Sequence, residues 1–159
     1  MSQYTLNRAQ LAQICSSQVW QRSMELSAPF ENQKALRDAA NKAFDLLEEH
    51  DWLEAFAGHP MIGDLSTLQA KYAQAKELSK EEQSSVQHAS QDTLVALLEL
   101  NQQYVKTFGF IFIVCATNKS ADEMLRLLKS RLTNSRNTEL LNAAKEQRAI
   151  SSIRMEAYV

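Results

Sequence analysis

The stretch "SADEMLRLLKSRL", Ser120 to Leu132, indicates the fold class of this chain. It opens with Ser120 and Glu123 at the S-x-x-E spacing of an N-terminal capping box. Apolar side chains then recur at steps of three and four, which places them on one face of a helix: Ala121, Met124, Leu125, Leu128 and Leu132. The start signal and the periodicity together predict an amphipathic α-helix.

Helical periodicity continues on both sides of this stretch. It predicts one or two short helices over 7–25, a helix over 31–49, a helix over 64–78, one or two helices over 79–108, and a last helix from about Asn137. We expect the first region to be anchored by Leu11, Ile14, Val19 and Trp20. The run "GFIFIVCA", residues 109–116, is the exception, because a short continuous apolar run fits a buried strand and a buried helix equally well.

The composition supports a helical protein. Only three glycines and two prolines occur among 159 residues, too few for the many turns of a sheet protein. Apolar residues make up 45% of the chain, which is enough for a hydrophobic core and argues against disorder. With no linker or repeat in the sequence, we predict an all-α fold, a single compact helical-bundle domain over residues 1–159.

Charge and hydropathy exclude two classes of partner. The net charge is −2, and the 17 basic and 19 acidic residues are interspersed, so no basic patch for nucleic acid is expected. No apolar run has the roughly 18–20 residues that span a membrane. Neither a signal-peptide pattern at the start nor a peroxisomal S-K-L at the end is present, so we expect a cytoplasmic protein. Cys15 and Cys115 are better interpreted as reduced thiols than as a disulfide or a nucleophile.

The stretch "FAGHPMIGDL", residues 56–65, concentrates the rare residue types. Two of the three glycines, one of the two prolines and His59 lie there. A histidine on a stiff loop between helices suits proton transfer near neutral pH. On residue types alone, an ordinary loop histidine beside a helix end explains the pattern better.

Two further patches admit both a functional and a structural interpretation. In "SKEEQ", Ser79 and Glu82 have capping-box spacing, which needs no function, whereas Gln83 could bind an amide-rich ligand. Arg154 follows an apolar position of the last helix. It could bind a carboxylate with its forked guanidinium, or pack its stem and leave its head in water. The three histidines lack metal-ligand spacing and no phosphate-binding glycine motif occurs, so neither a metal nor a dinucleotide is expected.

Taken together and in order, these patches resemble the OHCU decarboxylase family. The resemblance covers nearly the whole chain and includes "DWLEAFAGHPMIGD", "LSKEEQ", "FGFIFIVCATNKSADEMLRLLKSRL", Arg154, and the early Trp20, Pro29 and Phe30. It implies an all-helical homodimer without a cofactor. It also implies decarboxylation of 2-oxo-4-hydroxy-4-carboxy-5-ureidoimidazoline to (S)-allantoin and CO2 in urate breakdown, with stereospecific reprotonation.

The resemblance also implies roles for particular residues. His59 and Glu82 match the catalytic histidine and glutamate of the family. The expected substrate-binding positions are Pro60, Ser79, Gln83, Phe112, Ile113, Val114, Cys115, Ala116 and Arg154. The segment around 109–118 is then expected to be irregular and buried, with its main-chain groups facing the ligand. Departures from the family pattern fall at Met61, Ile111 and Asn118. The alternatives are a non-enzymatic helical interaction module and another cofactor-free lyase on the same scaffold.

Overall fold

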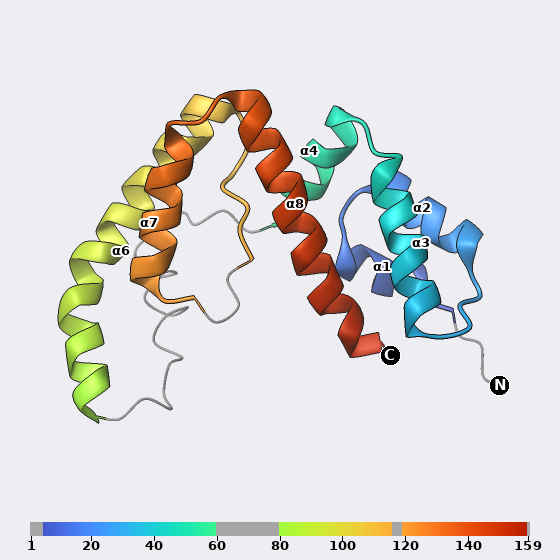
Figure 1. Ribbon diagram of the computed structural model, residues 1–159, viewed down its shortest axis with the longest axis horizontal. Coiled ribbons are helices and arrows are strands. Elements are labelled where there is room, and N and C mark those ends of the chain that lie inside the picture. Colours follow the sequence, from blue (N-terminus) through green and yellow to red (C-terminus); the bar gives the residue numbers. More distant parts are fainter. Residues whose placement is uncertain (1–4, 60–79, 116–118, 159) are drawn as a thin grey trace. The chain divides into compact units, whose positions relative to one another are not determined.

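A computed structural model of the chain describes residues 5–59, 80–115 and 119–158, and of residues 80–91 it describes the backbone alone (Figure 1). The regular elements are α1 (Arg8–Ile14), α2 (Gln18–Ser27), α3 (Gln33–Asp45), α4 (Glu49–Ala57), α6 (Lys80–Phe108), α7 (Ala121–Leu132), α8 (Arg136–Met155) and the 3-10 turn η1 (Glu156–Tyr158). No strand occurs in the described ranges, so the predicted all-α fold class is confirmed.

Most of the predicted helices form where their periodicity placed them. Residues 7–25 give two helices and residues 79–108 give one, while the helix predicted over 64–78 lies outside the described residues. Ser120 accepts a hydrogen bond from the Glu123 amide at 3.2 Å, which confirms the predicted start of α7. The prediction that Val19 anchors α2 is wrong. Val19 is 36% exposed, because Trp20 and Met24 occupy the face that α2 turns to the core.

The described residues form two compact units. The first comprises residues 5–59, 113–115 and 140–158, and the second comprises residues 80–112 and 119–139. The single domain over residues 1–159 stays a prediction from the sequence. Among the helices that the structure describes, none combines the length and the apolar character needed to cross a membrane.

A stack of aromatic rings forms the core of the first unit. Trp20, Phe44, Trp52 and Phe56 follow one another with ring centroids 5.3, 5.4 and 6.1 Å apart, and they join α2, α3 and α4. The buried indole of Trp20 also donates to the Ala40 carbonyl at 3.3 Å, so its polar atom is paired. This stack fixes the end of α4, one turn before His59.

The C-terminal part of α8 packs on the same stack. The Arg148 guanidinium lies 5.3 Å from the Phe44 ring centroid and 5.7 Å from that of Trp52, and it bonds Asp45 at 2.7 Å. A cation over aromatic faces gains both electrostatic attraction and packing of its stem. These contacts set the rotation of α8 in the first unit, and therefore which of its side chains face inward.

In the second unit, α6 and α7 lie side by side (Figure 1). Leu94 and Leu97 of α6 are buried, and so are Met124 and Leu128 of α7, whose spacing predicted it. Gly109 ends α6 with φ at +84°, a value that side-chain-bearing residues rarely adopt. Residues 109–115 then run without helix or strand, which confirms the expected irregular backbone over this part of the segment around 109–118. Only Phe110 and Ile113 are buried, so the expected burial is partial, and residues 116–118 lie outside the described residues.

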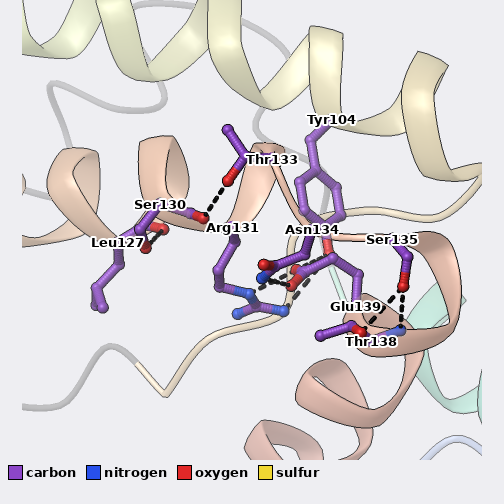
Figure 2. Close-up of polar contacts among 9 residues, drawn as sticks. All are labelled: Tyr104, Leu127, Ser130, Arg131, Thr133, Asn134, Ser135, Thr138 and Glu139. Atoms are coloured by element: carbon purple, nitrogen blue, oxygen red, sulfur yellow. Dashed lines mark hydrogen bonds and ion pairs between the residues drawn. The ribbon is translucent and has the colours of Figure 1, made fainter.

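A buried ion pair joins α6, α7 and α8 within the second unit (Figure 2). Glu139, which is fully buried, accepts from Arg131 Nε at 2.6 Å, from the Tyr104 hydroxyl at 2.6 Å and from Asn134 Nδ2 at 2.8 Å. The Arg131 guanidinium also lies 4.7 Å from the ring centroid of Phe112. Both carboxylate oxygens are therefore paired, as a buried charge requires.

Loss of this carboxylate should destabilise the protein strongly. Glu139→Ala leaves Arg131 charged, buried and without its main partner, so we expect the free energy of unfolding to fall by about 3–5 kcal/mol in urea titrations. The exposed Glu99 on α6 supplies the matched control, and Glu99→Ala should change stability by no more than about 0.5 kcal/mol. Equal losses in the two variants would contradict a structural role for the ion pair.

Candidate functional site

The structure brings two of the predicted site residues, His59 and Arg154, into contact in the first unit. Nη2 of Arg154 lies 3.5 Å from Nδ1 of His59, although 95 residues separate them in sequence. Both side chains are half-buried. A cation and an imidazole that meet at a partly exposed position can hold an anion beside a proton-transfer group.

His59 is held at the end of α4 by a close backbone approach. Its amide donates to the Phe56 carbonyl at 3.1 Å, and Gly58 before it closes the helix. A Cβ on Gly58 would lie 1.8 Å from Ser16 Oγ and 2.4 Å from Ser16 Cβ, so no larger residue fits without movement. Gly58 is therefore required for close packing, not for its backbone angle, and it brings His59 up to the chain that follows α1.

Arg154 is positioned by the last carbonyl groups of α1. Its Nη1 donates to the Gln13 oxygen at 3.1 Å and to the Ile14 oxygen at 3.4 Å. The carbonyl groups at a helix C-terminus have no partner within the helix and accept cations well. The guanidinium is thus fixed by backbone groups, and Nη2 is turned to His59.

Two buried residues that the sequence did not single out complete the arrangement. Gln147 Oε1 lies 2.5 Å from His59 Nε2, Gln147 Nε2 donates to Ser151 Oγ at 3.0 Å, and Ser151 Oγ donates to the Ile14 oxygen at 2.9 Å. Residues 147, 151 and 154 follow one another at helical steps of four and three. A polar stripe at that spacing, where apolar residues are usual, was the available signal.

The surroundings favour a neutral imidazole at His59. Burial lowers the pKa of His59 below its usual value of 6.5, and the positive charge of Arg154 lowers it further. The hydrogen bond between His59 Nε2 and Gln147 Oε1 opposes this by raising the pKa. Nearby, burial raises the pKa of the Cys15 thiol to about 11, so this cysteine stays a thiol at neutral pH. His59 can therefore act as a proton acceptor in the physiological range.

Arg154 keeps donors for a ligand. Its Nε–H has no acceptor among the described residues, and Nη2 makes only the long contact to His59. The Nε and Nη2 groups form the edge of a guanidinium that binds a carboxylate through two parallel hydrogen bonds. Within the described ranges, no group of three or more His, Cys, Asp or Glu side chains is arranged to hold a metal ion.

The structure describes only some of the other predicted site residues, and some of those by their backbone alone. Ile113, Val114 and Cys115 belong to the same unit as His59, and Phe112 belongs to the second unit. Glu82 and Gln83 lie in the first turn of α6, where the structure describes the backbone alone. Pro60, Ser79 and Ala116, together with Met61 and Asn118, lie outside the described residues.

Comparison with known proteins gives a consistent result. The family described as OHCU decarboxylase matches residues 3–156. The "Uric acid degradation bifunctional protein TTL" of Arabidopsis thaliana is 37% identical over 141 residues, which are 89% of this chain and 44% of that protein. The "2-oxo-4-hydroxy-4-carboxy-5-ureidoimidazoline decarboxylase" of Haloferax volcanii is 25% identical over 131 residues, 81% of this chain and 74% of that protein. The chain thus spans less than half the length of the Arabidopsis relative.

A solved structure matches over nearly the full length of both chains. It is a crystal structure of OHCU decarboxylase in the presence of (S)-allantoin, with 31% sequence identity and a TM-score of 0.77. The alignment covers 96% of this chain and 98% of that one. The family match over residues 3–156 spans α1 to α8, so it includes both His59 and Arg154.

The lowered pKa of His59 predicts in which direction the stability of the protein changes with pH. We expect its imidazole to titrate below pH 6.5 in NMR spectra, and Arg154→Met to raise that pKa by removing the cation. Because the unfolded chain binds this proton more readily, the free energy of unfolding should decrease as the pH falls from 6.5 to the folded pKa. Arg126→Met, on an exposed position of α7, should leave the titration unchanged. A His59 pKa above 6.5 in the parent protein would contradict the assignment.

Proposed function

Since the chain belongs to the OHCU decarboxylase family, we propose that it converts 2-oxo-4-hydroxy-4-carboxy-5-ureidoimidazoline to (S)-allantoin and CO2 in uric acid degradation. The contact between His59 and Arg154 is the observation that supports this function best. It places an anion-binding group within 3.5 Å of a neutral imidazole, as removal of a carboxylate followed by proton transfer requires.

The substrate carboxylate binds Arg154 in this proposal. The donors on Nε and Nη2 match the two carboxylate oxygens, and the backbone carbonyls of α1 hold the guanidinium in place. Binding there sets the carbon that bears the carboxylate and the hydroxyl next to the His59 ring. Fixing the reactants in this way removes much of the entropic barrier.

The substrate itself supplies the electron sink. When the bond to CO2 breaks, its electron pair moves through the adjacent C=N group onto the ring nitrogen. That nitrogen takes up one proton from solvent, which leaves an enol with an enamine N–H. The enol then loses its hydroxyl proton to become the carbonyl of the product, while the ureido-bearing carbon gains a proton on one face. His59 and Glu82 share these proton transfers, and delivery from one side makes the product a single enantiomer.

Other predicted residues have supporting roles in this proposal. Gln83 binds the ureido or ring amide groups, and main-chain groups of residues 112–116 complete the orientation. Pro60 and Ser79 are further substrate-binding residues in this proposal. The reaction needs no cofactor, because the imine accepts the electrons. We also propose that the protein is a homodimer, as the family resemblance implies, and that it acts in the cytoplasm.

The activity can be measured directly. The substrate is generated from urate with urate oxidase and hydroxyisourate hydrolase, and circular dichroism follows the appearance of (S)-allantoin over the racemic product of spontaneous decay. We expect the parent protein to accelerate the reaction, and His59→Ala to lose at least about 10² of that rate while remaining folded. His50→Ala is the control, because His50 is an exposed histidine in the first turn of α4, at the opposite end of that helix from His59. Equal rates with and without the protein would contradict the function.

The role of Glu82 can be separated from helix capping. Glu81 and Glu82 both lie in the first turn of α6, so either glutamate favours the helix dipole to a similar extent. We expect Glu82→Ala to lower kcat by about 10² and Glu81→Ala to leave it within about twofold. If both substitutions have the same small effect on rate, Glu82 stabilises the helix start and takes no part in proton transfer.

A further inference from the structure

The side chains around His59 form a closed ring of hydrogen bonds in the first unit. Starting from the Ile14 oxygen, the ring passes through Arg154, His59, Gln147 and Ser151 and returns to the same oxygen. Gln147 and Ser151 are fully buried, so water cannot replace their partners. Every donor in this cycle of hydrogen bonds therefore has to face an acceptor.

This requirement fixes the protonation of the His59 ring. Arginine carries donors only, so Nδ1 of His59, which faces Arg154 Nη2 at 3.5 Å, has to be unprotonated. A neutral imidazole then carries its proton on Nε2 and donates it to Gln147 Oε1 at 2.5 Å. The amide nitrogen of Gln147 donates to Ser151, whose hydroxyl proton goes to Ile14.

The other arrangements leave two donors facing each other. If the Gln147 amide were reversed, its NH2 group would face Nε2 while Arg154 faces Nδ1, and the one proton of a neutral ring would point at a donor on either side. If the ring were an imidazolium, its Nδ1–H would point at the Arg154 guanidinium. Only the tautomer with Nε2 protonated satisfies the whole ring of hydrogen bonds.

We propose that Gln147 is a positioning residue that holds His59 as the Nε2–H tautomer, so that Nδ1, on the side of Arg154, is the nitrogen that exchanges a proton with the substrate. The inference rests on the proposed decarboxylation for its catalytic part, whereas the tautomer itself follows from the hydrogen bonds alone. Gln147 bonds His59 Nε2 and Ser151 Oγ, so it acts through the imidazole.

The proton balance of the reaction agrees with this arrangement. Nδ1 takes the hydroxyl proton as the enol becomes a carbonyl, and the resulting imidazolium keeps its second N–H on Gln147 Oε1. Once CO2 has left, the uncompensated charge of Arg154 disfavours the imidazolium and drives the proton to the ureido-bearing carbon. The lowered pKa of His59 is consistent with an imidazole that is neutral in the free protein and protonated only during the reaction.

The tautomer can be read by NMR without any assay. In protein labelled with ¹⁵N-histidine, long-range ¹H–¹⁵N spectra distinguish a protonated from an unprotonated ring nitrogen, and His59→Ala identifies the His59 signals among three histidines. We expect Nε2 to be protonated and Nδ1 unprotonated in the parent protein. A ring protonated on Nδ1 would overturn the proposal, and this result is independent of whether the protein decarboxylates anything.

Two substitutions test the role of Gln147 itself. Gln147→Met keeps the length of the side chain and removes the acceptor, so we expect a mixture of tautomers and a decrease in kcat of about 10-fold or more, with KM changed less than about twofold. Gln147→Glu keeps the acceptor and adds a negative charge. It should retain the Nε2–H tautomer in the neutral ring and raise the pKa of His59, which moves the acidic limb of the pH–rate profile to higher pH.

A second buried glutamine provides the control. Gln21 bonds the Cys15 carbonyl and Arg8, so Gln21→Met removes a similar amide and should leave the His59 tautomer unchanged. Unchanged tautomer and kcat in Gln147→Met would overturn the positioning role. Should that variant fail to fold, the parent tautomer and the shift of the pH profile in Gln147→Glu still decide the question. A parent protein with the expected tautomer but no decarboxylase activity would contradict the proposed function alone.

Discussion

The carbonyl groups of Gln13 and Ile14 end a seven-residue helix and have no partner within it, and the first unit is arranged around the donors that satisfy them. These donors are Arg154 and Ser151, which both lie on α8. The N-terminal helices and the C-terminal helix are therefore joined by backbone hydrogen-bonding requirements as well as by apolar packing. Because the same guanidinium reaches His59, the interaction that stabilises the unit also places its reactive groups.

The two units contain buried polar groups of different character. Glu139 in the second unit is a charged centre whose donors include Arg131, Tyr104 and Asn134, and the Arg131 guanidinium lies over the ring of Phe112. The network around Gln147 is neutral except for Arg154, and it includes a histidine that can titrate. A fixed ion pair suits a structural support, whereas a neutral network next to one cation suits a group that has to gain and lose a proton.

Much of the fold could be predicted from local patterns, and the failures have physical causes. The capping signal at Ser120 and the periodicity after it predicted α7, because both depend on residues within one or two turns. Val19 was misplaced because an apolar residue next to Trp20 cannot share its face of the helix. Gln147 was missed because periodicity counts apolar residues, and this helix turns polar residues inward.

The sequence by itself determined the helical class, most helix positions, the family and the candidate pair His59 and Arg154, since these follow from spacing, composition and motif order. Only the tertiary structure decided that the pair meets in the first unit, that Gly58 is required for its approach to Ser16, and that Gln147 and Ser151 complete the hydrogen bonds. Contacts across 88 and 95 residues depend on how α8 packs on α1 and α4. That packing is set by buried surfaces and unpaired backbone groups, which no local pattern records.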